Sequence, residues 1–216
     1  MTDTIKNTKL RRPITVTDLY RKNFNVLQFT GQWFSLMGNP EVKGSWIIFG
    51  DSSNGKTRFV IKLAKYLANF GIVYINSLEE GESESIKQGF KAEQMEDVKD
   101  KVYLLDNEPL EVVKQHLRKK RNAPDFVFFD SVQFMRSFTE ADYMNLLEEF
   151  PTKIFIFTSH VKGKEPKGAL AEAIRYRSFV KLFVSVFRVF PKSRYGGGAP
   201  FDIWPEKAQA YHLKTE

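Results

Sequence analysis

The chain has 216 residues, which suffice for one substantial domain with its own core and exclude a large multidomain machine. Hydrophobic residues make up 42% and charged residues 27%, as in a folded globular protein, and the net charge of +7 favours an anionic partner such as a nucleotide or a nucleic acid. The lack of cysteine excludes disulfides, cysteine-ligated metal centres and a thiol nucleophile, and the 3 histidines argue against a histidine-only metal site.

Residues 1–40 differ in character from the rest of the chain. Residues 1–12 are polar, end before Pro13 and predict a flexible arm. Thr17 and Asp18 then predict the capped start of a short helix, whereas the aromatic stretch Leu27–Met37 predicts no single conformation. The chain begins without the apolar core of a signal peptide, and no later apolar run approaches the roughly 18 residues that span a bilayer. We therefore expect a cytoplasmic protein without membrane contact, whose main domain is residues 41–216.

From residue 45 onward, short apolar segments alternate with longer segments of helical periodicity. The expected strands are Ser45–Phe49, Ile72–Asn76, Lys101–Leu105, Phe126–Asp130 and Lys153–Thr158. The expected helices between them are Lys56–Phe70, Ser83–Gln94, Glu108–Lys120 and Glu140–Phe150. Each helix is long enough for a crossover between parallel strands. The pattern predicts a three-layer α/β fold with a mainly parallel twisted sheet flanked by helices.

The C-terminal part of the chain changes to a period of two. Side chains alternate from Phe179 to Phe190, which predicts one long antiparallel strand. The run Arg194–Pro200 contains three consecutive glycines and predicts a turn into a partner strand, Phe201–Trp204. We therefore expect a C-terminal antiparallel β-hairpin.

The segment after the first expected strand satisfies the pattern G-x-x-x-x-G-K-[ST], and an expected helix follows it. Its residues are Gly50, Asp51, Ser52, Ser53, Asn54, Gly55, Lys56 and Thr57. The glycines let successive backbone N–H groups face a phosphate at the positive end of the helix. The Lys56 ammonium suits the β and γ phosphates of a nucleotide, and the Thr57 hydroxyl suits Mg²⁺. A chance glycine loop before a helix is the alternative, but the order of strand, loop and helix favours the phosphate site.

Carboxylates follow two other expected strands. Asp130 ends the strand that begins at Phe126, where it can hold Mg²⁺ directly or through water and orient Thr57; its alternative role is to cap the next turn. Glu79 and Glu80 lie just beyond the second expected strand, where one of them could accept a proton from an attacking water molecule. A neighbouring like charge raises a carboxyl pKa towards neutrality, which suits a base. A solvated acidic turn explains this pair equally well.

The order of these segments resembles the RecA-like ATPase core, and most closely the RadA-type recombination ATPases and the DnaB-type replicative helicases. The matching segments are Gly44–Phe49, the phosphate loop, Tyr74–Glu80, Phe128–Gln133, Phe157–Lys162 and Lys192–Gly196, and together they extend over roughly residues 44–204. No cysteine-rich zinc module, protease-like domain or helical N-terminal domain accompanies them. The resemblance therefore implies a stand-alone ATPase core, such as a phage or another mobile element carries.

The resemblance also implies roles for individual residues. Glu79 would activate water, with Glu80 as a second carboxylate. Asp130 would be the acid that holds Mg²⁺ beside the bound ATP. Ser159 or His160, at the end of the last expected parallel strand, would sense the γ-phosphate of that nucleotide.

Two further segments concern the partners that the resemblance implies. Lys192 and Arg194 lie in an element similar to the K-x-R-[FY]-G element, so they would act on the nucleotide of a neighbouring subunit, which requires a homo-oligomer such as a ring or filament. The segment Val161–Arg177 corresponds to a loop that contacts DNA, and its cations can neutralise the phosphates of a strand that we expect to be single-stranded. These cations are Lys162, Lys164, Lys167, Arg175 and Arg177. A basic solvated loop is the alternative.

The function that these expectations favour is an Mg²⁺-dependent, oligomeric ATPase that acts on DNA in replication or recombination, together with a partner protein of that process. Its expected place is the cytoplasm of a bacterial cell or of a phage-infected host. One alternative is a nucleotide-gated assembly or loading factor that hydrolyses little ATP and works by population shift. The other is a P-loop kinase, although the sequence offers no clear nucleoside pocket.

Overall fold

The structure is a computed structural model and describes residues 12–212. Its main sheet has the strand order β10-β9-β8-β1-β5-β4-β2-β3. From β8 to β3 neighbouring strands pair in parallel, whereas β8 with β9 and β9 with β10 pair antiparallel. The strands are β1 (Ser45–Gly50), β2 (Val73–Ser77), β3 (Val102–Asp106), β4 (Phe126–Asp130), β5 (Ile154–Ser159), β8 (Val180–Ser185), β9 (Arg188–Ser193) and β10 (Phe201–Asp202). The predicted mainly parallel α/β sheet is confirmed.

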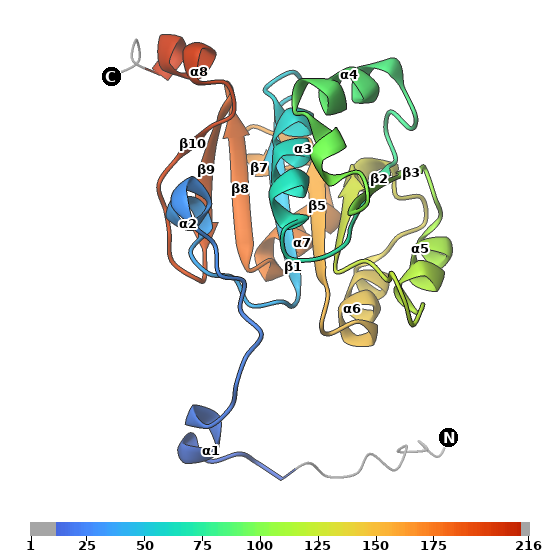
Figure 1. Ribbon diagram of the computed structural model, residues 1–216, viewed down its shortest axis with the longest axis vertical. Coiled ribbons are helices and arrows are strands. Elements are labelled where there is room, and N and C mark those ends of the chain that lie inside the picture. Colours follow the sequence, from blue (N-terminus) through green and yellow to red (C-terminus); the bar gives the residue numbers. More distant parts are fainter. Residues whose placement is uncertain (1–11, 213–216) are drawn as a thin grey trace.

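Helices cover both faces of the sheet, so the fold has three layers (Figure 1). The α-helices are α1 (Val16–Tyr20), α2 (Gly31–Met37), α3 (Lys56–Leu67), α4 (Glu84–Ala92), α5 (Leu110–Leu117), α6 (Glu140–Glu149), α7 (Ala169–Arg177) and α8 (Pro205–His212), with short 3₁₀ turns η1 (Met95–Val98) and η2 (Val132–Phe134). The helices and strands expected between residues 45 and 158 are all present, with ends shifted by a few residues at most.

Two apolar clusters form the core, one on each face of the sheet. The first joins α2 and α3 to the sheet around Trp46 and Phe59, which are fully buried. The second joins α5, α6 and α7 to the other face, around Tyr143, Phe157 and Ile174. Burial on both faces explains why the central strands consist of nearly continuous apolar residues. The carboxyl ends of these strands are thereby held rigidly along one edge.

The N-terminal segment has two helices with different surroundings. In α1 the N-cap is Thr15, which forms a capping box with Asp18, and the helix stands apart from the sheet with Tyr20 83% exposed (Figure 1). In α2 the ring of Trp33 stacks on Tyr66, with ring centroids 4.9 Å apart, so this helix belongs to the core. Most of the predicted arm, residues 1–11, lies outside the described residues.

The prediction of one long strand from Phe179 to Phe190 is wrong. This stretch is the hairpin β8–β9, which turns at Val186 and Phe187 with positive φ angles of 41° and 59°. Tertiary hydrogen bonds hold the turn, because the Phe187 N–H donates to the Asn54 carbonyl at 3.2 Å and the Phe187 carbonyl accepts from the N–H of Ile203 at 2.8 Å. The predicted C-terminal antiparallel hairpin is confirmed, but its turn lies at these residues, and the glycine-rich run leads from β9 into β10.

The basic segment after β5 is also more regular than a loop. It contains a small antiparallel hairpin of β6 (Val161–Lys162) and β7 (Glu165–Pro166), followed by α7. Within residues 12–212, no helix is long and apolar enough to cross a membrane.

Candidate functional site

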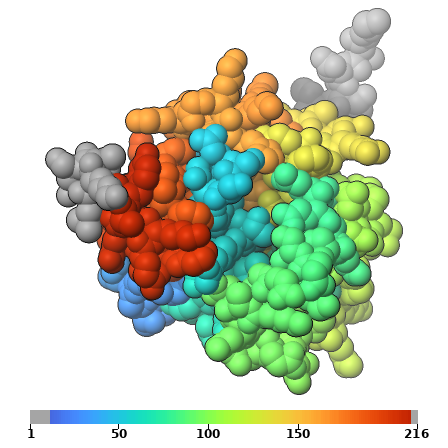
Figure 2. Space-filling view, turned by 90° about the horizontal axis from the view of Figure 1, so that it is seen from above, coloured from blue at the N-terminus to red at the C-terminus, as the bar shows by residue number. Residues whose placement is uncertain are grey.

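The phosphate loop joins the end of β1 to the start of α3, at the carboxyl edge of the sheet. Gly50 has no room for a side chain, because a Cβ there would lie 2.1 Å from the carbonyl oxygen of Val184 on β8. Gly55 is the N-cap of α3 and has a φ of 95°, which favours glycine. Figure 2 looks down on this edge and shows the cyan loop near the middle of the face, between the red C-terminal segment and the green α4. An anion can reach the loop and the helix start from outside.

Lys56 curls over this loop from the first residue of α3. Its ammonium donates to the carbonyl oxygens of Gly50 and Asp51, at 2.8 Å each. Burial lowers the pKa of Lys56, and the negative charges of Asp130, Glu79 and Asp51 oppose that shift. A partly buried cation among carboxylates is suited to meet phosphate oxygens together with a metal ion.

Asp130 lies at the end of β4, and β5 separates that strand from β1. Burial raises the pKa of its carboxyl group, and a hydrogen bond from the Thr158 hydroxyl opposes the shift. The Asp130 backbone carbonyl accepts from the N–H groups of Leu78 and Glu79, at 2.6 and 3.1 Å. These bonds tie the end of β4 to the segment that follows β2, and so bring Glu79 beside Asp130.

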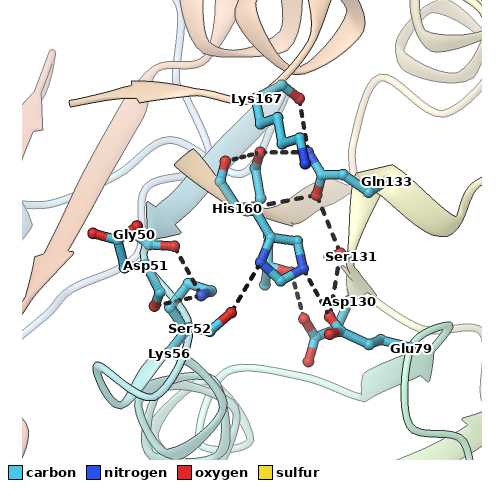
Figure 3. A network of polar contacts seen from close by, with 12 residues as sticks. Gly50, Asp51, Ser52, Lys56, Glu79, Asp130, Ser131, Gln133, His160 and Lys167 are labelled. Atoms are coloured by element: carbon cyan, nitrogen blue, oxygen red, sulfur yellow. Dashed lines mark hydrogen bonds and ion pairs between the residues drawn. The ribbon is translucent and has the colours of Figure 1, made fainter. Parts of the chain in front are cut away.

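Glu79 and Glu80 turn to different neighbours. The Glu79 carboxylate lies 3.2 Å from Nε2 of His160 and 3.5 Å from the Ser131 hydroxyl (Figure 3). The Glu80 carboxylate accepts instead from the hydroxyl of Ser83, the N-cap of α4, at 3.4 Å. Of the two acids, Glu79 is therefore the one that contacts His160 and Ser131 opposite the phosphate loop.

His160 connects this cluster to the phosphate loop. Its Nδ1 lies 3.5 Å from the Ser52 hydroxyl, and its Nε2 contacts Glu79, so the ring spans the gap between the loop and the carboxylate (Figure 3). Ser159, in contrast, is fully buried, and its hydroxyl donates to the His160 carbonyl at 2.7 Å. The geometry favours His160 over Ser159 as the residue that would meet a γ-phosphate.

Gln133 is a residue to which the sequence analysis gave no role. Its side-chain N–H₂ donates to the Ser159 hydroxyl and to the Lys167 carbonyl, at 2.9 Å each, and its oxygen accepts from the His160 N–H at 3.2 Å (Figure 3). The residue therefore links η2, the end of β5 and the base of the β6–β7 hairpin. A polar side chain only three positions after Asp130 was the available signal.

The residues present fit a magnesium ion held mainly by a nucleotide. Asp130 offers a buried carboxylate, and Thr57 offers a hydroxyl at the second position of α3. These are hard oxygen ligands, which Mg²⁺ prefers. Few protein ligands suffice, because Mg²⁺ takes its other ligands from water molecules and from the phosphates of the nucleotide. Among residues 12–212 no group of at least 3 histidine, cysteine, aspartate or glutamate side chains could hold a metal ion by itself.

Lys192 and Arg194 lie far from the phosphate loop of their own chain. Lys192 pairs with Lys181, which is level with Ile47 on β1, so it sits about 10 Å along the strand direction from Gly50. The Arg194 N–H donates to the carbonyl of Phe179 at 3.0 Å, which places Arg194 at the amino edge of the sheet. Neither cation can complete the phosphate site of its own chain.

The predicted nucleic-acid contacts fall into two groups. Lys162, Lys164 and Lys167 are exposed on or beside the β6–β7 hairpin, in the orange segment that follows β5 (Figure 2). Arg175 and Arg177 lie on α7 and form ion pairs with Glu165 and Glu140, at 2.8 and 3.4 Å. The three exposed lysines are therefore more available to an anionic partner than the two arginines, which already form ion pairs.

Comparison with known proteins supports the fold. No protein-family model matches the chain. It is 28% identical to the DNA repair protein RadA of Streptococcus pyogenes serotype M3 over 128 residues, which are 58% of this chain and 27% of that protein. The chain thus spans only about a quarter of the length of the curated relatives it matches.

Solved structures resemble the chain over most of its length. The flagellar accessory protein FlaH from Methanocaldococcus jannaschii has a TM-score of 0.55 at 16% identity, covering 83% of this chain and 92% of its own. The KaiC-like protein PH0186 from Pyrococcus horikoshii has a TM-score of 0.56 at 18% identity, covering 78% and 88%. The ATPase domain of G40P has a TM-score of 0.51 at 14% identity, covering 74% and 80%. With the phosphate loop at the end of β1, these similarities show that the chain has the RecA-like α/β fold.

Proposed function

We propose that this chain binds ATP with Mg²⁺ at the loop Gly50–Thr57 and hydrolyses it. The observation that carries the proposal is the meeting of three strand ends at one place. The loop follows β1, Asp130 ends β4, and Glu79, beyond β2, is held beside them through His160. A phosphate cradle, a metal-binding carboxylate and a carboxylate base are the parts that phosphoryl transfer to water requires.

Each residue has a distinct task in this proposal. Lys56 and the N–H groups of the loop bind the β and γ phosphates. Thr57 and Asp130 would hold Mg²⁺, which would supply positive charge against the developing negative charge. Glu79 accepts a proton from the attacking water molecule. His160 keeps the Glu79 carboxylate oriented towards the loop. Asp130 would serve as a metal ligand and not as a base.

We further propose that the protein works on DNA as a homo-oligomer, in replication or recombination. The exposed lysines of the β6–β7 hairpin support contact with phosphates of a nucleic acid. Gln133 joins the base of that hairpin to the end of β5. The hairpin that would contact the nucleic acid is therefore connected to the strand end that would contact the nucleotide. Lys192 and Arg194, remote from the loop of their own chain, would act on the nucleotide of a neighbouring subunit. The name of one similar protein, the DNA repair protein RadA, favours a process on DNA, and the name of another, the ATPase domain of G40P, favours ATP hydrolysis.

Steady-state ATP hydrolysis, measured with Mg²⁺ over a range of protein concentrations, tests this function. The expected result is a turnover per subunit that rises with protein concentration and again on adding single-stranded DNA at low salt. Tight ATP binding with negligible turnover in every condition would contradict hydrolysis and favour a nucleotide-gated loading factor.

A further inference from the structure

A second cluster of cations lies at the amino-edge side of β8 and β9, away from the phosphate loop. Lys181 and Lys192 are directly opposite each other in the antiparallel pair β8–β9, so their side chains leave the same face of the sheet. Arg194 lies just beyond the end of β9, with its guanidinium 4.8 Å from the centre of the Phe179 ring. These residues line a cleft of about 410 Å³ that is bordered by Phe179 and the glycines at 196–198.

The cations of this cleft have no acidic partners. No aspartate or glutamate is among the described residues that line the cleft. Within residues 12–212, Lys181, Lys192 and Arg194 form no ion pair. Arg175 is the one neighbouring cation that is neutralised, through Glu165 at 2.8 Å. The cleft therefore keeps an excess of positive charge.

Like charges directly opposite each other on paired strands destabilise a sheet. Burial lowers the pKa of Lys181, and the positive charges of Arg175, Arg194 and Lys192 lower it further. An anion in the cleft would relieve this repulsion. A phosphate group carries more negative charge and more acceptor oxygens than a single carboxylate, so it suits a cleft with three cations better.

We propose that Lys181 joins Lys192 and Arg194 in one phosphate-binding cleft, in which Lys181 is a ligand-contacting residue. This inference deepens the proposed function and rests on it, because it adds a third cation to the pair that would act on a neighbouring subunit. The open side of the cleft suits a phosphate that another molecule presents, since a Cβ at Gly196 or at Gly198 would meet nothing within 4 Å.

The first experiment measures thermal unfolding at low salt with inorganic tripolyphosphate as the probe. It uses a Lys56→Ala background, which weakens the phosphate loop. Tripolyphosphate should raise the Tm of that protein, and adding Lys181→Met should remove at least half of the shift. Adding Lys99→Met, which removes an exposed lysine that pairs with Glu96 at 3.2 Å, should leave the shift unchanged.

The same variants test the repulsion without any ligand. Lys181→Met should raise the Tm of the anion-free protein by about 1–3 °C, because it removes one of two opposed charges. A fall in this Tm would show that Lys181 stabilises the fold and would overturn the proposal. An undiminished tripolyphosphate shift in the Lys181→Met protein, or no shift in its Lys56→Ala parent, would overturn it as well.

The source of the phosphate decides between two further results. If the phosphate belongs to the nucleotide of a neighbouring subunit, Lys181→Met should lower ATP turnover, and mixing it with Glu79→Gln subunits should restore part of that turnover. The affinity for an oligonucleotide should then not change. If it belongs to a nucleic acid, Lys181→Met should weaken binding of a single-stranded oligonucleotide severalfold and reduce the salt slope by about one. If Lys181→Met changes neither the ATP turnover nor the oligonucleotide affinity, the proposed phosphate-binding cleft is contradicted. A wild-type chain that fails to hydrolyse ATP contradicts the proposed function alone, since the tripolyphosphate measurement needs no turnover.

Discussion

Nε2 of His160 lies 3.2 Å from the carboxylate of Glu79, although the two residues are 81 positions apart in the chain. The contact forms because β2 and β5 flank β4, so the segments beyond their carboxyl ends converge above it. On its other side the ring reaches Ser52 in the phosphate loop. His160 can therefore hold Glu79 in place and respond to what the loop binds.

We predict that His160→Ala lowers the turnover of ATP far more than it weakens ATP binding. Loss of the imidazole leaves the Glu79 carboxylate free to rotate, and a misplaced catalytic group costs on the order of 100-fold in rate. Turnover and the Kd for Mg-ATP should be measured on the same preparation. Because His160 acts through Glu79, adding His160→Ala to Glu79→Gln should cost little more than Glu79→Gln alone; full additivity of the two losses would contradict this role.

Lys56→Ala should abolish the thermal stabilisation that Mg-ATP gives to the protein. The ammonium is the only side-chain cation that the structure shows bound to the loop carbonyls, at Gly50 and Asp51. Thermal unfolding with and without Mg-ATP checks this, and Lys99→Met serves as a control that retains the ligand-induced shift. An unchanged shift in Lys56→Ala would place the nucleotide elsewhere.

Arg194→Ala should leave ATP binding intact and lower turnover. The residue lies at the amino edge of the sheet, remote from its own phosphate loop, so the loss should reflect action between subunits. Mixing Arg194→Ala with Glu79→Gln subunits should restore part of the activity, because each supplies what the other lacks. Failure of this rescue, with subunit exchange confirmed independently, would count against a role in a neighbouring site.

Glu93→Gln should destabilise the protein at neutral pH and much less in acid. Glu93 joins α4 to α3 by ion pairs to Arg58 and Lys62, at 2.6 and 2.8 Å. Burial alone would raise the pKa of Glu93, but the hydrogen bonds from Lys62 and Arg58 outweigh it and hold the pKa below its usual value. The carboxylate therefore stabilises the fold above the pKa that a glutamate has in the unfolded chain, and this contribution is lost as the pH falls through the native pKa.

Chemical denaturation at neutral and at acid pH measures this effect. The free energy of unfolding should drop by about 1–2 kcal/mol in Glu93→Gln at neutral pH, and the gap from the wild type should close as the pH falls. Glu96→Gln is a matched control, since Glu96 is exposed and, among residues 12–212, forms an ion pair with Lys99 alone. A gap that stays constant with pH would show that the ionised carboxylate is not the source of the stability.

The sequence was informative where local pattern and tertiary structure agree. The parallel strands are buried on both faces, so their apolar runs and the helices between them could be predicted within a few residues. The phosphate loop could be found because glycine, lysine and threonine occupy fixed places between a strand and a helix. Glu79 and Glu80 lie beyond the end of a strand, and their contacts depend on tertiary packing. No local pattern in the sequence predicts those contacts.

The turn at Val186 and Phe187 shows where sequence patterns fail. Both residues favour strands, and the alternation of side chains continues through them, so nothing local indicates a turn. Contacts made only in the folded protein hold it, from the Phe187 N–H to Asn54 and from the Phe187 ring to Trp204, with ring centroids 5.9 Å apart. The register of Lys181 against Lys192 follows from this turn, so the second cation cluster was equally hidden.

The most direct test of the central claim compares Mg²⁺-dependent ATP turnover and ATP binding in three proteins: the wild type, Lys56→Ala and Glu79→Gln. The wild type should bind and hydrolyse ATP, and Lys56→Ala should do neither. Glu79→Gln should bind ATP but hydrolyse it at least 100-fold more slowly, as expected when a general base is removed (roughly 10²–10⁴-fold). Wild-type turnover in Glu79→Gln, or equal turnover after Mg²⁺ is chelated, would contradict the assignment of this site.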